Sequence, residues 1–139
     1  MFNVYFRNNH VSIYFDKERR IGKAVWSGHL RGMEFREASL LCLDLVDRYE
    51  LLAWLSDNRK MNSVKPADLQ WSLEVLVPQL VESHLLRMAI LPSEFEESRN
   101  AMGLMLERKD KLDQRPLMRN FDSEEEAMVW LQGEQVTSV

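Results

Sequence analysis

A chain of 139 residues with 45% apolar and 29% charged residues has the size and composition of one folded domain with a sizeable core. Its formal net charge of −4 argues against nucleic acid as a partner, because broad affinity for nucleic acid depends on neutralising phosphates. Cys42 is the only cysteine, which excludes an intrachain disulfide and a cysteine zinc site. No apolar run approaches the roughly 20 residues that span a bilayer, and no signal-peptide pattern opens the chain, so we expect a cytoplasmic protein.

The first part of the chain predicts three short strands. Residues 4–6 are apolar or aromatic, and the Asn8-Asn9 pair suits a turn because asparagine tolerates positive φ. Residues 11–16 alternate between apolar and more polar side chains, and residues 21–26 form a third strand pattern. The connections are too short for crossover helices, so we expect an antiparallel meander.

The middle of the chain predicts a helix, a buried strand and a second helix. Apolar residues recur at helical spacing from residue 33 to 49. Residues 51–55 (LLAWL) are apolar without a break, which is typical of a strand buried on both faces in a parallel sheet, and we expect Ser56 and Asp57 to end it. A helix then begins at Pro66 and carries an apolar stripe to residue 80, with a kink or an early stop at Pro78.

The last third repeats the alternation of strand and helix. Residues 85–91 predict a strand, 95–109 a helix and 117–121 a short strand. Ser123 and Glu126 then form a capping-box pattern before a final helix, and we expect a frayed tail over residues 133–139. The resulting order, β-β-β-α-β-α-β-α-β-α, predicts an α/β fold with antiparallel N-terminal strands and a parallel portion in one mixed sheet.

The strongest candidate site is a polar segment directly after the buried strand. It contains an acid, an amide, two bases and a nearby hydroxyl: Asp57, Asn58, Arg59, Lys60 and Ser63. Ligands of open α/β sheets bind near the carboxyl ends of strands, and a helix N-terminus beside them favours anions. The alternative interpretation is that Asp57 pairs with Arg59 or Lys60 and only holds a turn in place.

Two further residue groups have a functional and a structural interpretation. Five methionines could line an adaptable pocket or simply fill the core: Met88, Met102, Met105, Met118 and Met128. Four aromatic residues in the predicted strands could bind a partner or a second copy of the chain on an uncovered sheet face, or pack beneath helices: Tyr5, Phe6, Tyr14 and Phe15. Cys42 lies in an apolar helix pattern and is expected to behave as a small buried hydrophobe. The histidine spacing shows no helical metal motif, and no cofactor is predicted.

Several short motifs together resemble a group of small bacterial STAS-like proteins, similar in fold to anti-sigma-factor antagonists and more distantly to Sec14-type lipid-binding domains. These motifs are Trp54-Leu55-Ser56-Asp57-x-Arg59-Lys60-Met61, Pro66-x-Asp68-x-x-Trp71, Pro78, Arg87-Met88-Ala89 with Pro92 and Phe95, and Phe121-x-Ser123-x-Glu125-Glu126-Ala127-x-x-Trp130-Leu131. The resemblance covers most of the chain and implies a single STAS-like domain over residues 1–139. It further implies a sheet with helices mainly on one face, and a role in binding rather than catalysis.

The resemblance does not carry over the antagonists' phosphorylated serine. Their Asp-Ser-Ser-Gly motif is absent here, since Asn58, Arg59 and Lys60 follow Asp57. Our first hypothesis is therefore a non-enzymatic interaction or regulatory module with a protein partner at the segment around Asp57. The alternative is a small-molecule or lipid-binding domain with a Sec14-like pocket, and a homodimer through an uncovered sheet face is a side prediction.

Overall fold

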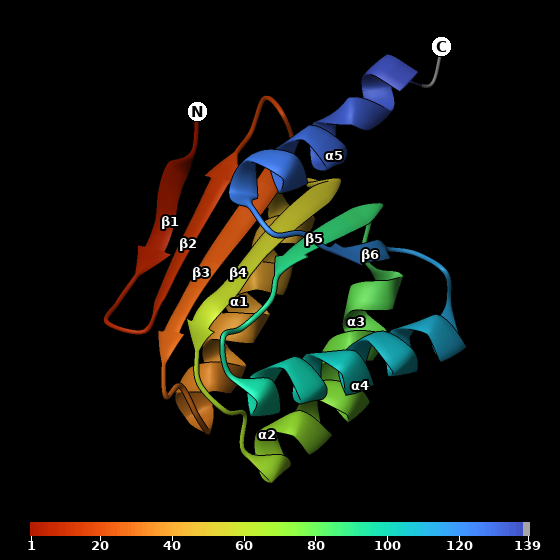
Figure 1. Cartoon of the computed structure of the whole chain (residues 1–139). Coiled ribbons are helices and arrows are strands. Elements are labelled where there is room, and N and C mark those ends of the chain that lie inside the picture. The colour runs from red at the N-terminus through yellow and green to blue at the C-terminus, as the bar shows by residue number, and fades with distance from the viewer. Residues whose placement is uncertain (138–139) are drawn as a thin grey trace.

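The structure, a computed structural model, describes residues 1–137, of which the last four are described by their backbone alone. Its centre is a six-stranded mixed sheet with the spatial order β1-β2-β3-β4-β5-β6 (Figure 1). The strands are β1 (Asn3–Arg7), β2 (Val11–Asp16), β3 (Ile21–Gly28), β4 (Ala53–Met61), β5 (Arg87–Leu91) and β6 (Leu117–Asn120). β1, β2 and β3 pair antiparallel, whereas β3 to β6 pair parallel, which confirms the predicted mixed sheet.

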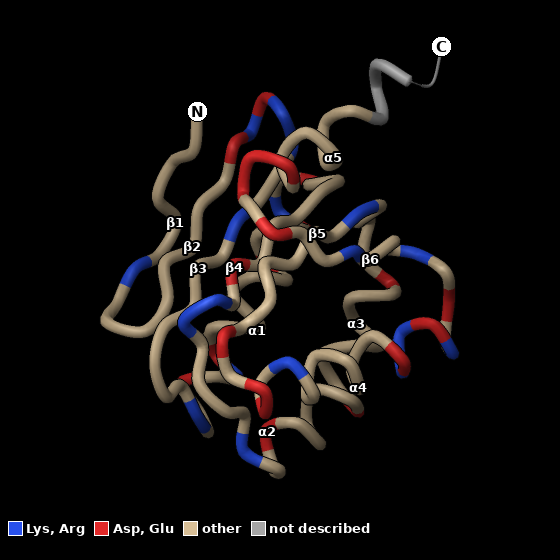
Figure 2. Tube along the Cα trace, in the orientation of Figure 1, with Lys and Arg blue, Asp and Glu red and all other residues tan. Residues whose placement is uncertain are grey.

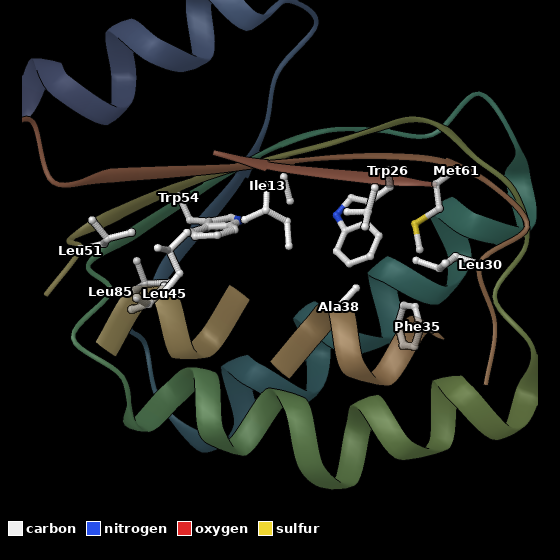
Figure 3. Packing of buried hydrophobic residues seen from close by; sticks show 13 residues of the cluster. Ile13, Trp26, Leu30, Phe35, Ala38, Leu45, Leu51, Trp54, Met61 and Leu85 are labelled. Carbon is white, nitrogen blue, oxygen red and sulfur yellow. The ribbon is translucent and has the colours of Figure 1, made fainter. Parts of the chain in front are cut away.

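The helices lie mainly on one face of this sheet. They are α1 (Met33–Arg48), α2 (Pro66–Trp71), the π-helix η1 (Ser72–Leu76), α3 (Val77–Glu82), α4 (Glu96–Leu112) and α5 (Glu124–Thr137). Figure 3, in which the sheet is seen edge-on, shows α1 and the segments from α2 to α4 on one side of it, and α5 packs on the opposite face. With α2, η1 and α3 counted as one helical stretch, the predicted order of strands and helices is confirmed.

The helical stretch continues through Pro78, where we expected a kink or an early stop. The chain is helical up to Glu82, so the early stop is wrong. Directly before the proline, the Val77 N–H donates to the carbonyl of Ser72, five residues back, and the turn is a wide π turn. Pro78 consequently falls in the first turn of α3, where its missing N–H is tolerated.

The core has two parts because β4 is covered on both faces. Between the sheet and α1, Trp54 packs with residues such as Ile13, Trp26 and Leu45 (Figure 3). On the opposite face, Leu55 packs with Ile21, Ala89, Leu91 and the α5 residues Ala127 and Leu131. The prediction of a strand buried on both faces is therefore confirmed for residues 53–55. Gly22 on β3 is required by this packing, since a Cβ there would overlap the Trp54 ring.

A buried carboxylate joins α2 to the start of α1. Asp68 is 2% exposed, and its Oδ2 accepts a hydrogen bond of 2.9 Å from the Gly32 N–H, immediately before α1. Arg36 adds an ion pair, with 3.4 Å between Arg36 Nε and Asp68 Oδ1. Gly32 adopts φ 62°, a left-handed conformation that glycine accepts without the penalty of a side chain.

The C-terminal helix begins as predicted and extends further than predicted. The Ser123 hydroxyl accepts the Glu126 N–H at 3.2 Å, which is the N-cap contact that the capping-box pattern indicates. We expected fraying over 133–139, but α5 remains helical to Thr137, and residues 138–139 lie outside the described residues.

Basic and acidic residues are interspersed along the chain rather than separated into two regions (Figure 2). Within residues 1–137, no helix has the length and apolar composition needed to cross a membrane.

Candidate functional site

Most of the polar segment after the buried strand belongs to that strand, so our expectation that Ser56 and Asp57 end the strand is wrong. β4 runs to Met61, and its end pairs with an extended β3, with Lys60 opposite Ser27 and Met61 opposite Gly28. A bulge in this pairing lies between Asp57 and Lys60. Because successive strand side chains point to opposite faces, the predicted site residues are separated rather than gathered.

Asp57 and Arg59 point to the α5 face and bind each other. The Arg59 guanidinium donates two hydrogen bonds to the Asp57 carboxylate, 2.9 Å from Nε to Oδ1 and 2.8 Å from Nη2 to Oδ2. Burial alone would raise the pKa of Asp57, but the hydrogen bonds from the side chain and backbone of Arg59 outweigh burial and lower it. This pair matches the structural interpretation of Asp57, in which it pairs with a neighbouring base, although within a strand.

The other three predicted residues have different surroundings. Asn58 is 7% exposed and points to the opposite face, under the helices, where its Oδ1 accepts a hydrogen bond of 2.7 Å from the Ser56 hydroxyl. Lys60 is exposed at the end of β4. Ser63 is half-buried in the segment between β4 and α2. Asp57 and Asn58 are each 7% exposed, but of the five predicted residues only Asn58 points to the face beneath α1 to α4 and lines a cavity there.

A partly open cavity of about 110 Å³ lies between the sheet and the helices, next to Asn58. Its walls come from β3 to β6 and from all the helical segments on this face except α2. Most lining side chains are apolar, and they include Trp26, Trp54, Leu76, Leu80 and five methionines: Met61, Met88, Met102, Met105 and Met118. The cavity exists because α4 packs against α3 and η1 rather than directly on the strands beneath it.

Four of the five methionines suspected from the sequence line this cavity, and Met128 does not. Met128 packs instead in the core beneath α5. Sequence reasoning missed Met61, because the strand β4 was expected to end before it. It also missed the small polar residues Ser39 and Ser56, which carry no spacing signal of their own.

A second cavity of about 90 Å³ adjoins the first. Asn58 and Met102 line both, so they form the boundary between the two spaces. The second cavity is more polar and lies between the N-terminal half of α4 and the carboxyl ends of β5 and β6. Its other polar side chains are Ser93, Ser98, Arg99 and Asn120.

Three lining side chains are almost completely buried and have hydrogen-bonding atoms without a protein partner in the described chain. They are the amide nitrogen of Asn58, the hydroxyl of Ser39 and the hydroxyl of Ser98, in residues that are 7%, 4% and 4% exposed. Among the described residues, the one fully enclosed side-chain atom without a hydrogen-bond partner is Arg36 Nε, which lies in the ion pair with Asp68, so these three groups adjoin open space. Buried polar groups normally have a partner, so these three groups are available to hydrogen-bond a molecule that enters the cavities.

Two reactive side chains on the cavity wall have structural explanations. Burial raises the pKa of the Cys42 thiol, which keeps it protonated and agrees with its expected behaviour as a hydrophobe. Lys109 is 2% exposed, and its Nζ donates to the Gln114 carbonyl at 2.9 Å and lies 2.6 Å from the Asp110 carboxylate. In the described chain, no group of three His, Cys, Asp or Glu side chains is arranged to hold a metal ion.

Comparisons of the chain with models of protein families, with curated proteins and with solved structures give no match. The STAS-like resemblance therefore stays a prediction, and the site has to be interpreted from its own geometry.

Proposed function

We propose that this protein is a non-enzymatic binding protein that holds a small, mainly apolar molecule in the cavity between the sheet and α4. The observation that carries the proposal is the cavity of about 110 Å³ with its apolar walls and few polar groups. An engineered apolar cavity of roughly 150 Å³ in another protein binds benzene, so a space of this size suits a small ring or a short chain.

The composition of the walls supports binding rather than incomplete packing. Ligand sites are typically apolar with a few polar groups that fix orientation, and here Ser39, Ser56 and Asn58 supply those groups. Methionine side chains are unbranched and polarisable, so five of them allow the walls to adapt to a guest. Met88, Met102 and Met105 are only half-buried, so these side chains adjoin space that protein atoms do not fill.

Tryptophan fluorescence provides the test, because Trp26 and Trp54 line the cavity and Trp71 and Trp130 do not. Bromine quenches tryptophan on contact, so a terminally brominated alkanol should quench the wild-type protein saturably. An unbrominated alkanol of the same length should reverse the quenching.

Substitutions on α1 supply the matched comparison for this experiment. Cys42→Phe places a ring in the cavity and should abolish saturable quenching. Leu40→Phe makes a similar increase in size at a residue that is 43% exposed and outside the cavity, and it should bind as the wild type does. Wild-type quenching that rises linearly without saturation, or that survives Cys42→Phe, would contradict the proposed function.

The end of β4 supports a second candidate, the interaction module with a protein partner. The favouring observation is that Lys60 is exposed and that the Arg59 side chain is 46% exposed despite its ion pair. A pull-down that compares the wild type with a Lys60→Ala, Ser63→Ala double variant tests this candidate, and identical partner sets would contradict it. A bacterial STAS-like identity, a cytoplasmic location and a homodimer likewise stay predictions.

A further inference from the structure

The charged residues that line the two adjoining cavities are all basic. Each contains one basic lining residue, Lys109 in the first cavity and Arg99 in the second, and neither is lined by an aspartate or glutamate. A guest with a negative charge therefore meets no carboxylate on either wall. This arrangement selects against cationic guests and favours anionic ones.

The two basic residues differ in how far their charge is already compensated. Lys109 lies beside the Asp110 carboxylate and also donates to a backbone carbonyl. Arg99 donates from Nη1 to the Ser93 carbonyl at 2.9 Å, and the described residues give it no ion pair. Since a guanidinium has five N–H donors, Arg99 keeps donors for another acceptor.

Other donors converge on the same end. The Ser98 hydroxyl and the Asn58 amide nitrogen line the second cavity without protein partners. Ser98 is also the third residue of α4, near the positive end of the helix dipole. Arg99 is exposed, so a charged group bound here would keep some contact with water and avoid the full cost of burial.

We propose that the guest is a single-chain carboxylate, with its chain in the first cavity and its carboxylate in the second, bound by Arg99, Ser98 and Asn58. This inference rests on the proposed function, because it needs the first cavity to accept an apolar chain. α4 runs alongside both spaces, and Ser98 and Lys109 are separated by about 16 Å along it at 1.5 Å per residue. The two adjoining spaces, taken together along α4, therefore suit an extended chain better than a ring system.

The test compares decanoate with decanol, which share a chain and differ in the charge of the head group. Titration calorimetry on the full chain should give a lower Kd for decanoate than for decanol. Arg99→Gln should raise the Kd for decanoate by at least about tenfold, as expected for the loss of a hydrogen bond between charged groups. The Kd for decanol should stay unchanged. Arg108→Gln removes an exposed charge from the same helix, outside both cavities, and should leave both affinities unchanged.

The outcomes separate this inference from the proposed function. If decanol does not bind the wild type, the adjoining spaces take no chain of this length and the carboxylate assignment is overturned, whereas the quenching experiment decides the proposed function on its own. If decanol binds but Arg99→Gln weakens both ligands equally, or neither, the proposed function stands and the carboxylate assignment is overturned. A decanoate affinity no better than that of decanol in the wild type would overturn it as well.

Discussion

Filling the cavity should stabilise the protein, and Cys42→Leu is the most direct way to fill it. Cys42 lies on α1 and lines the space, and leucine adds about two carbon groups there. At roughly 0.8 kcal/mol per buried methylene, the free energy of unfolding should rise by about 1–1.5 kcal/mol. For a chain of 139 residues this corresponds to an increase in Tm of about 3–5 °C.

The sign of the change distinguishes an open cavity from a closely packed core. In a packed core the same enlargement costs about 1–3 kcal/mol, because side chains are forced out of their preferred rotamers. Ala38 provides the matched control, since it lies on the same helix, is 4% exposed and does not line the cavity. Urea unfolding monitored by circular dichroism should therefore show Cys42→Leu stabilised and Ala38→Leu destabilised. A Cys42→Leu variant destabilised as much as Ala38→Leu would refute the reasoning.

Three other substitutions test the packing and the ion pairs by urea unfolding. Gly22→Ala should destabilise by about 1–3 kcal/mol because its Cβ meets an aromatic ring, whereas Gly103→Ala, on an open part of α4, should stabilise by up to about 1 kcal/mol; equal effects would contradict the close approach at Gly22. Asp68→Ala removes the acceptor of a backbone N–H before α1 and should cost roughly 1–3 kcal/mol, and a cost near zero would show that water replaces the carboxylate. Asp57→Asn should be less stable than the wild type at pH 7. Because the folded-state pKa of Asp57 lies below its unfolded value of about 3.9, this difference should shrink as the pH falls below about 4, and a constant difference would contradict the role of the ion pair.

The fold could be predicted well from the sequence because the local residue patterns agree with the strand pairing in the sheet. The unbroken apolar run at residues 51–55 indicated a strand covered on both faces, and Trp54 and Leu55 pack into the two separate cores. Short connections between the first strands left only an antiparallel arrangement for them. The early stop predicted at Pro78 was wrong because the Val77 N–H bonds to the Ser72 carbonyl in a π turn. Pro78 therefore lies in the first turn of α3, where no N–H is needed.

The candidate site was harder to predict because its geometry depends on contacts far apart in the chain. The sequence Asp57-Asn58-Arg59-Lys60 is polar enough for a loop, but pairing with the end of β3 keeps it extended and turns Asn58 inward. The methionines gave a partial signal. What no local pattern shows is that α4 packs on α3 and η1 and leaves a space above the strands.

Methionine-methyl NMR tests the central claim most directly, because methionines lie both on and away from the cavity walls. Met61, Met88, Met102, Met105 and Met118 line the first cavity, whereas Met1, Met33 and Met128 do not. Titration of methyl-labelled protein with decanol should shift the five lining methyl signals together and saturably, and leave the other three in place. Shifts confined to Met1 and Met33, which are 96% and 70% exposed, or no saturable shift at all, would contradict an internal binding site.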